Sequence, residues 1–459
     1  MEIENRIHFS IQNLSDDVLM EIFKFLTLKD IALIQLINKE WKKSTEKPFL
    51  WRKIKYDFQE HEIKDKQLYI QWVMEKISIY NVEQLIINDP NCHLAFQDIC
   101  QIFSKSFNCL QDLELSIYNL NESQAQIISL LVVKNCPNLK CFTTYGCFAM
   151  DQFMEHFQLL KKLDSLHIMC NDNSFTGSSL RTLPPLKKLF LRPYLIEYNN
   201  ILEVIRKGKN TLEELAIDTE QMDDDQVIKL FNELNKTKIQ SLLLNYCEYF
   251  QDQVFTSLSQ FSRLKRLKFY KANEVTQDGY LTCFQNFSST SLIHLNLKEC
   301  NELNDEGLIS ILSKSSQLEC LKLAWQKNIT SESIKYLFSN CFNLQTCVLI
   351  GIKSLDATGF PAIQELQQYF EVQKYNELKR NNQYQDDYNN DCINNQAYTF
   401  IDIQNYFTKQ IDRSSIIKYY QKLRLIDCTK TDMVPDQILQ ILHLFKPYLI
   451  ARNYYGEEM

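Results

Sequence analysis

The residue types that carry most enzyme chemistry are present in this chain but are not spaced for it. The seven histidines form no recognisable motif with acids or thiols, and the 15 cysteines include no C-x-x-C pair. The eight glycines stand apart, so neither a glycine-rich phosphate loop nor the elbow of a serine hydrolase can be written. We therefore expect no catalytic residues, no metal site and no cofactor.

A different chemistry, the binding of anions, is indicated between residues 266 and 325. Basic and aromatic residues recur there at intervals that bring them onto one face of neighbouring strands. The candidate binding residues are Arg266, Lys268, Tyr270, Lys298, Lys322 and Trp325. Lys268 and Lys322 would lie roughly 10 Å apart, two strand spacings, so a phosphate or carboxylate could bridge them. The alternative is a solvated face of mixed charge.

The elements that would position these residues are repeats of one pattern: apolar, two residues, apolar, one residue, apolar. The triplets recur about every 26 residues, a period typical of leucine-rich repeats, in which a short strand and a helix stack on the next unit. They are Leu110/Leu113/Leu115, Leu139/Phe142/Thr144, Leu163/Leu166/Ile168, Leu186/Leu189/Leu191, Leu212/Leu215/Ile217, Ile239/Leu242/Leu244, Leu264/Leu267/Phe269, Leu292/Leu295/Leu297, Leu318/Leu321/Leu323 and Leu344/Cys347/Leu349. Less regular candidates are Val82/Leu85/Ile87, Tyr398/Ile401/Ile403, Tyr420/Leu423/Leu425 and Phe445/Tyr448/Ile450.

Several cysteines hold fixed places relative to these triplets. Cys247 and Cys300 follow a first apolar residue by eight positions, as Cys147 and Cys428 also would, and Cys136 and Cys341 precede one by three. The arrangement resembles the cysteine-containing subclass of leucine-rich repeats. We expect these thiols to be buried beside turns in a reducing compartment, rather than to bind metal.

Residues 14–51 predict two or three short amphipathic helices. Ser15 is placed to cap the first, Thr27 and Asp30 to open the second with a capping box, and Pro48 to begin the third. A piece of about 40 residues cannot bury so many large apolar groups by itself. We therefore expect another surface to cover the remainder, which is either the following domain or a partner.

This segment resembles an F-box, the helical module that docks on a Skp-type adaptor of cullin–RING ubiquitin ligases. The matching residues are Leu14, Asp17, Leu19, Ile22, Phe23, Leu26, Leu28, Lys29, Asp30, Leu36, Trp41, Leu50 and Trp51. Ser15 and Asn38 depart from the family pattern, which usually has proline and a cysteine or small residue at these places.

The resemblance implies a role for each part of the chain. The expected adaptor contacts are Leu14, Ser15, Val18, Leu19 and Leu28, while Trp41 would hold the module together. The concave face of the repeats, including the basic cluster, would bind a protein substrate that is acidic or phosphorylated, for ubiquitination and proteasomal degradation. The chain would then be a non-catalytic substrate receptor, in the cytoplasm, the nucleus or both.

Charge and hydropathy narrow the expected partners. The formal net charge of −7 disfavours binding to nucleic acid. The sequence contains no run of 18 apolar residues, so we expect no membrane-spanning segment. The other classes left open are a structural scaffold, such as a cytoskeletal or ciliary subunit, in which the N-terminal helices only cap the repeats, and an inhibitor-type binding protein.

The expected fold class is α/β, a three-helix F-box followed by a leucine-rich-repeat solenoid with a parallel sheet on its concave face and helices on its convex face. We place the F-box at residues 10–54, a helical linker at 55–80 and the solenoid at 81–459, with about 11 to 13 repeats. An Asn- and Gln-rich insertion near residues 368–397 would interrupt one repeat.

Overall fold

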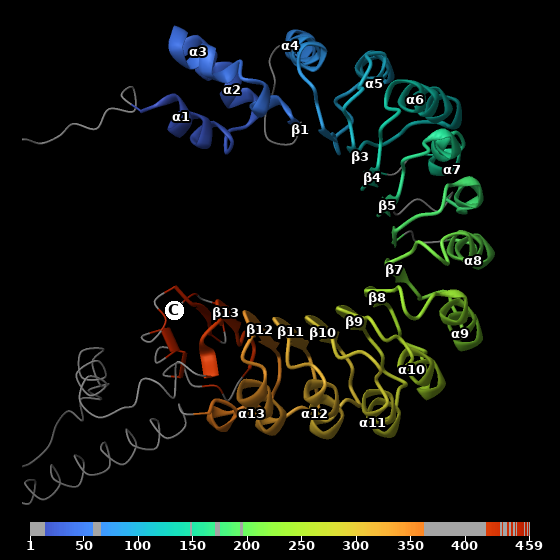
Figure 1. Cartoon of the computed structure of the whole chain (residues 1–459), viewed down its shortest axis with the longest axis vertical. Helices are drawn as coiled ribbons and strands as arrows, with labels where there is room; N and C mark the ends of the chain where they lie inside the picture. The colour runs from blue at the N-terminus through green and yellow to red at the C-terminus, as the bar shows by residue number, and fades with distance from the viewer. Residues whose placement is uncertain are drawn as a thin grey trace, which may run out of the picture. The chain divides into compact units, whose positions relative to one another are not determined.

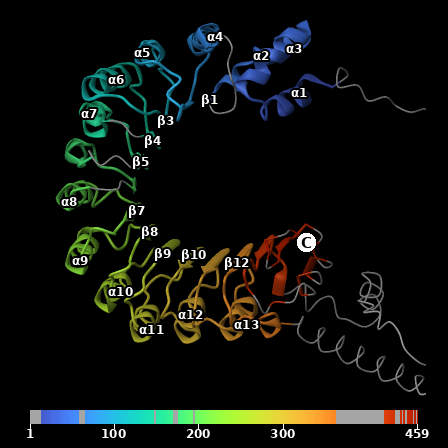
Figure 2. The ribbon, with the colours of Figure 1, turned by 180° about the vertical axis from the view of Figure 1, so that it is seen from behind.

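The computed structural model describes residues 14–57, 66–146, 149–169, 175–192, 196–361 and 419–431, and only short stretches beyond residue 431. The chain divides into two compact units, Met1–Leu212 and Glu213–Met459. Within each unit the helices lie on one side of a parallel sheet to which each repeat adds a strand (Figure 1; seen from behind in Figure 2). The expected α/β solenoid after an N-terminal helical module is confirmed. The face of each sheet turned away from its helices is called the open sheet face below.

The first unit begins with the helical module and continues into the repeats. Its strands β1 to β6 pair in parallel and in chain order. Its elements are α1 (Asp16–Phe23), α2 (Leu28–Ile37), α3 (Lys39–Thr45), η2 (Pro48–Trp51), β1 (Lys53–Asp57), α4 (Lys66–Ile79), β2 (Gln84–Asn88), α5 (Phe96–Phe103), β3 (Asp112–Ser116), α6 (Glu122–Asn135), β4 (Cys141–Thr144), α7 (Met150–Met154), η3 (Phe157–Leu159), β5 (Ser165–Ile168), η4 (Ser178–Thr182), β6 (Lys188–Leu191) and α8 (Tyr198–Lys207).

The second unit is more regular, with a strand and a helix in each of its first five repeats. Strands β7 to β14 also pair in parallel and in chain order. Its elements are β7 (Glu214–Asp218), α9 (Asp224–Glu233), β8 (Ser241–Asn245), α10 (Asp252–Leu258), β9 (Arg266–Tyr270), α11 (Gln277–Gln285), β10 (His294–Lys298), α12 (Asp305–Ser313), β11 (Cys320–Ala324), α13 (Ser331–Asn340), β12 (Thr346–Ile350), η5 (Ala357–Gly359), β13 (Leu425–Asp427) and β14 (Ile450–Arg452).

The expectation of a purely helical linker from residue 55 is wrong at its start, because β1 occupies Lys53–Asp57 before α4 begins. In β1 the buried side chains of Ile54 and Tyr56 alternate with the exposed side chains of Lys53 and Lys55. This alternation is the ordinary pattern of a strand with one face in a core, and β1 extends the sheet toward the helical module.

An aromatic cluster joins the helical module to α4. Trp51 is fully buried, stacks on Tyr80 with ring centroids 5.5 Å apart, and meets Trp72 edge-on at 5.5 Å. The Trp51 indole N–H donates to the Thr45 carbonyl at 2.7 Å, and the Tyr80 hydroxyl donates to the Glu46 carbonyl at 2.7 Å. The module is therefore packed and hydrogen-bonded to the start of the repeats.

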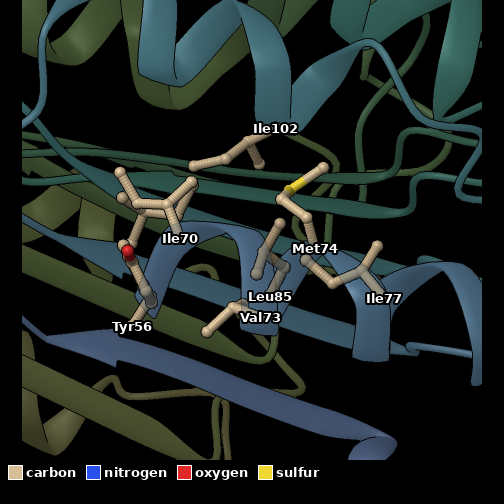
Figure 3. A pocket seen from close by; sticks show the side chains of 8 residues that line it. Tyr56, Ile70, Val73, Met74, Ile77, Leu85 and Ile102 are labelled. Atoms are coloured by element: carbon tan, nitrogen blue, oxygen red, sulfur yellow. The ribbon is translucent and has the colours of Figure 1, made fainter. Parts of the chain in front are cut away.

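Beside this cluster, α4 packs on the first strands through apolar side chains (Figure 3). Tyr56 of β1 and Leu85 of β2 lie across a cavity of only about 10 Å³ from the helix. The lining residues contributed by α4 are Ile70, Val73, Met74 and Ile77. A cavity this small leaves room for little more than one water, so this joint is closely packed.

Two C-terminal triplets are placed in the wrong register by the sequence pattern. The structure pairs Cys347 of β12 with Ile426, so the buried residues there are Leu423, Ile426 and Cys428, whereas Leu425 is only partly buried. In β14 the buried residue is Ala451, and Tyr448 is 96% exposed. The Tyr398 triplet and the insertion near 368–397 lie outside the described residues.

Successive repeats are tied together by an aspartate at the first position of a helix. Asp305 of α12 accepts hydrogen bonds from the Thr330 backbone N–H at 2.9 Å, the Thr330 hydroxyl at 2.5 Å and the Ser333 hydroxyl at 2.5 Å. Asp252 of α10 accepts the same pair of bonds from Thr276, at 2.8 and 2.7 Å. A charged acceptor thus fixes the start of the next helix.

Replacing Asp305 by alanine should lower the free energy of unfolding by about 2–4 kcal/mol, because hydrogen bonds to a charged group contribute about 1.5–3 kcal/mol each. Urea unfolding followed by circular dichroism measures the change. The neighbouring Glu306 is exposed in the same helical turn, so Glu306→Ala is the matched control, expected within about 0.5 kcal/mol of the parent. Equal losses in the two variants would contradict this role of Asp305.

Candidate functional site

The helical module exposes large apolar side chains on its first two helices. On α1, Val18 is 45% exposed and Ile22 is 36% exposed. On α2, Leu33, Leu36 and Ile37 are 52%, 82% and 61% exposed. These five residues are called the apolar strips below. Exposed apolar area concentrated on one small module is typical of a surface that binds another protein.

The five expected adaptor contacts divide into two groups. Ser15 and Val18 are exposed and Leu14 is half-buried, whereas Leu19 and Leu28 are buried at 4% and 7% exposure. The two leucines pack inside the module, so they offer little side-chain area to a partner while the module keeps this conformation. The first three remain accessible from solvent.

The capping predictions are confirmed in part. Thr27 and Asp30 form a capping box: the Asp30 backbone N–H donates to the Thr27 hydroxyl at 3.2 Å, and the Thr27 backbone N–H donates to the Asp30 carboxylate at 3.2 Å. Ser15 occupies the N-cap position of α1, but its side chain makes no capping hydrogen bond. Trp41 is half-buried and meets the buried Phe23 edge-on at 6.0 Å, a contact that agrees with its expected packing role.

The exposed residues Leu33, Leu36 and Ile37 of α2 were not predicted as contacts from the sequence, although a signal for them is present. Apolar residues lie all round α2, where Leu28 and Ile31 are buried and Leu33, Leu36 and Ile37 are exposed. A short surface helix that is apolar on every side can bury only one side in its own module. The excess on the other side indicates a partner.

The structure brings the predicted basic cluster together on the open sheet face of the second unit. Lys268 of β9, Asn296 of β10 and Lys322 of β11 are paired in register, so the two lysines lie two strands apart across an asparagine. Tyr270 and Lys298 are paired at the ends of β9 and β10. The strand register that was expected from the apolar triplets is confirmed for these residues.

Part of this charge is already engaged within the chain. Arg266 forms an ion pair with Glu214, which reaches it across β8 from β7. The Lys298 ammonium lies 4.6 Å from the centroid of the Tyr270 ring and 3.6 Å from the Glu299 carboxylate. The Glu214 and Lys298 contacts were not foreseen, and they reduce the charge that Arg266 and Lys298 can offer to a ligand.

Burial lowers the pKa of His294, and the nearby Arg266 lowers it further. The imidazole therefore adds little positive charge to the basic cluster near neutral pH.

Trp325 is held as an exposed platform at the end of β11. Its φ of 58° lies in the left-handed region, and its backbone N–H donates to the Ile350 carbonyl at 2.8 Å. The ring covers Gly351, where a Cβ would come within 2.5 Å of the indole, and the Lys430 ammonium lies 5.3 Å from the ring centroid. The side chain remains 40% exposed, although a positive φ is costly for a bulky residue.

Four cysteines are buried where the repeat pattern predicted them, whereas Cys428 is buried as the third apolar residue of the corrected β13 triplet and not at the predicted eighth position. Cys136, Cys247, Cys300 and Cys341 are buried, and burial raises their pKa values to about 12, 12, 11 and 12. Thiols with such pKa values carry almost no thiolate near neutral pH and are poor nucleophiles. Cys147 lies outside the described residues.

The residues that the structure describes contain no group of three or more His, Cys, Asp or Glu placed to hold a metal ion. None of the helices in this described part is long and apolar enough to cross a membrane.

Comparison with known proteins gives a match for the N-terminal module and a distant relative for a longer part of the chain. A family model described as F-box-like matches residues 11–57. The chain is 25% identical over 299 residues to the DNA repair protein RAD7 of Saccharomyces cerevisiae, in an alignment that covers 60% of this chain and 52% of that protein. It therefore spans about half the length of this curated relative.

Most of the chain also resembles a solved structure in fold. It resembles a chain in the crystal structure of the Rad7 and Elc1 complex in yeast, with a TM-score of 0.55, 18% identity, and coverage of 94% of this chain and 98% of that chain. A more distant match is the leucine-rich repeat-containing protein LegL7 from Legionella pneumophila, with a TM-score of 0.37, 14% identity, and coverage of 61% of this chain and 87% of that chain.

Proposed function

Because this chain joins an F-box-like module to a leucine-rich-repeat solenoid, we propose that it is the substrate-recognition subunit of an SCF-type ubiquitin ligase. The module docks on a Skp-type adaptor, and through it on a cullin–RING ligase, while the open sheet face of the repeats holds a protein substrate for ubiquitination and proteasomal degradation. The chain performs no bond-making step itself. It raises the effective concentration of the substrate beside a ubiquitin-carrying partner enzyme.

The observation that carries this proposal is the exposed apolar surface of the module. Leu36 is 82% exposed and Ile37 is 61% exposed, although both lie in a helix whose other side is buried. The related structure was solved as a complex of Rad7 with Elc1, which supports a comparable adaptor for this chain. We expect such a partner to cover the apolar strips.

Affinity purification of the full chain from its own cells, followed by mass spectrometry, tests the assembly. A Skp-type or Elc1-like adaptor, a cullin and a RING protein should be recovered together, and substrates should accumulate on the chain when the proteasome is inhibited. Recovery of the chain without any adaptor would contradict the proposal.

A structural scaffold is the second candidate, and one observation favours it. The aromatic cluster of Trp51, Trp72 and Tyr80 packs the module onto the first repeats, as a terminal cap of a solenoid would be packed. A cap, however, needs no apolar residues on its outer side, so it leaves the apolar strips unexplained. A scaffold or an inhibitor-type binder would also leave the half-life of its partner unchanged when this chain is depleted.

For the substrate, we propose an acidic or phosphorylated segment that binds between Lys268 and Lys322, with Arg266, Tyr270, Lys298 and Trp325 at the margins. The register of β9, β10 and β11 supports this placement, because it separates the two lysines by two strand spacings, roughly 10 Å. Trp325 adds a fixed aromatic surface for the apolar part of such a segment. The complex would act in the cytoplasm, the nucleus or both.

Changing Lys268 and Lys322 together to glutamate should weaken substrate capture at least tenfold, since each lost charge-assisted hydrogen bond contributes about 1.5–3 kcal/mol. Proximity labelling under proteasome inhibition measures capture. The matched control is Lys229→Glu with Lys335→Glu, which reverses two exposed charges on helices α9 and α13 of the same unit. Unchanged labelling in the Lys268 and Lys322 variant, with adaptor recovery intact, would place the substrate elsewhere.

A further inference from the structure

A pocket of about 520 Å³ lies where the helical module meets β1, apart from both surfaces described above. Its volume falls within the range of sites that hold a small ligand or a few side chains. Its lining comes from the end of α1, the α1–α2 loop, the start of α2, η2, the segment from Arg52 through β1, and α4, and it includes Phe23, Phe25, Phe49, Lys53 and Lys55. This is called the basic pocket below.

The interior of the basic pocket is apolar, and its apolar surface continues to the outside. Phe23, Ile31 and Leu50 line it as buried core residues. Phe25 is 88% exposed and Phe49 is 48% exposed at the same pocket. Neither phenylalanine belongs to the apolar strips, and an 88% exposed phenylalanine contributes almost nothing to the stability of its own module. These features suit a bulky apolar group from outside.

The charged residues that line the pocket all have the same sign. Five of the fourteen described lining residues are basic and none is acidic: Lys24, Lys29, Arg52, Lys53 and Lys55. This concentration occurs in a chain whose net charge is −7. The net charge of the whole chain would repel an anion, so any attraction for an anion at the pocket comes from these five basic residues.

Acids outside the lining neutralise part of this charge. Glu21 pairs with Lys24, and Glu83 lies 3.6 Å from Arg52. Burial raises the pKa of the Glu114 carboxyl on β3, and the charges of Lys53 and Lys55 act in the opposite direction. Lys24 also lies 4.5 Å from the centroid of the Phe49 ring, which holds a cation and an aromatic group side by side at the pocket. Lys53 and Lys55, both exposed on β1, are the simplest charges to test by substitution.

We propose that the basic pocket binds a short acidic peptide segment of a partner protein, with one large apolar side chain inside the pocket and flanking carboxylates against the basic residues. The apolar interior favours a peptide over a nucleic acid, whose backbone would leave the interior empty. The pocket volume suits one or two large side chains. This site would give the module a second point of contact, independent of the apolar strips.

The test uses the full chain and fluorescence anisotropy with a labelled decapeptide of Asp and Glu around one central Phe. The peptide should bind saturably, and added salt should weaken it, because the contacts are ionic. Lys53→Glu with Lys55→Glu should weaken binding at least tenfold. Lys161→Glu with Lys162→Glu, two exposed neighbours in the same unit, is the matched control and should bind as the parent does.

A second variant tests the apolar part without risk to folding. Phe25→Ser at an 88% exposed position should weaken the Phe-containing peptide at least fivefold. The same substitution should have little effect on a peptide in which the central Phe is replaced by Ala. The contact between Phe25 and the peptide's Phe is already absent in that peptide, so removing Phe25 costs nothing more.

Three results would overturn the proposal: no peptide binding at 1 mM, equal binding by the Lys53 and Lys55 variant, or binding of an oligonucleotide or anionic vesicles at this site in place of the peptide. Adaptor recovery measured on the same variants keeps a failure of the basic pocket distinct from a failure of the proposed function.

Discussion

Leu33→Glu combined with Leu36→Glu should abolish retention of a Skp-type adaptor by the full chain. The two side chains lie one turn apart on α2 and are 52% and 82% exposed, so an adaptor that covers α2 must bury both. Each leucine contributes about 1.5–3 kcal/mol when it is fully buried, and burying unpaired carboxylates adds a further penalty. The affinity should therefore fall by about 100-fold or more.

The substitutions should leave the fold intact, because glutamate is a good helix former and both positions face solvent. Calorimetric titration with purified adaptor measures the affinity, and thermal unfolding checks the fold. Ile127→Glu with Leu159→Glu is the matched control, since these residues of the repeats are 46% and 56% exposed but lie outside the module. An adaptor that binds the α2 variant as tightly as the control would show that the strip on α2 is not its docking surface.

A comparison with the interior positions separates two roles of leucine in the module. Leu19 and Leu28, which the family pattern places among the adaptor contacts, are only 4% and 7% exposed. Replacing Leu19 by alanine would leave a cavity and lower the stability of the module, so a loss of adaptor binding in that variant would not identify a contact. Exposed positions such as Leu36 avoid this ambiguity.

The register of most strands could be predicted from the sequence, because the apolar triplet has a fixed relation to the buried side of each strand. In β9, Leu267 and Phe269 are buried toward the helices, so Lys268 between them must lie on the open sheet face. The alignment of Lys268 with Asn296 and Lys322 follows once each repeat adds one strand. The periodicity of the apolar triplets was therefore sufficient to predict this part of the candidate site.

The same rule failed where apolar residues are too dense to define a unique triplet. Around β13, Tyr420, Leu423, Leu425 and Ile426 fit the pattern in more than one register. The structure resolves the choice through packing, since Tyr420 lies against Phe338 with ring centroids 4.9 Å apart and precedes the strand. A local pattern contains no information about this contact between residues far apart in the chain.

The apolar triplet pattern also could not predict contacts that depend on side-chain size or on bends in the backbone. Glu214 reaches Arg266 because the intervening residue on β8 is the small Ser241. Trp325 adopts a positive φ that sequence rules assign to glycine or asparagine, and the neighbouring Gly351 provides the space under its ring. The first contact requires the arrangement of three strands to be known, and the second requires that of two.

Trp51→Ala should lower the free energy of unfolding of the first unit by about 3–5 kcal/mol, the range for removing a fully buried tryptophan. The indole is completely buried, donates to the Thr45 carbonyl at 2.7 Å and stacks on Tyr80. Its loss would break the packing between the module and α4 as well as a hydrogen bond. Trp51→Phe, which keeps an aromatic ring, should cost less.

Hydrogen exchange followed by mass spectrometry shows whether Trp51 connects the module to the repeats or stabilises only the residues around it. If Trp51 connects the two parts, the alanine variant should accelerate exchange in α1 to α4 and β1 together, while α12 in the second unit exchanges as before. Trp325→Ala removes a tryptophan that is 40% exposed and should change none of these rates. Faster exchange confined to η2 would mean that Trp51 does not connect the module to the repeats. Under the proposed function, faster exchange in α1 to α4 and β1 with the adaptor still bound should be accompanied by slower substrate ubiquitination. Repeats that are loosely joined to the adaptor-bound module would no longer hold the substrate in a fixed position.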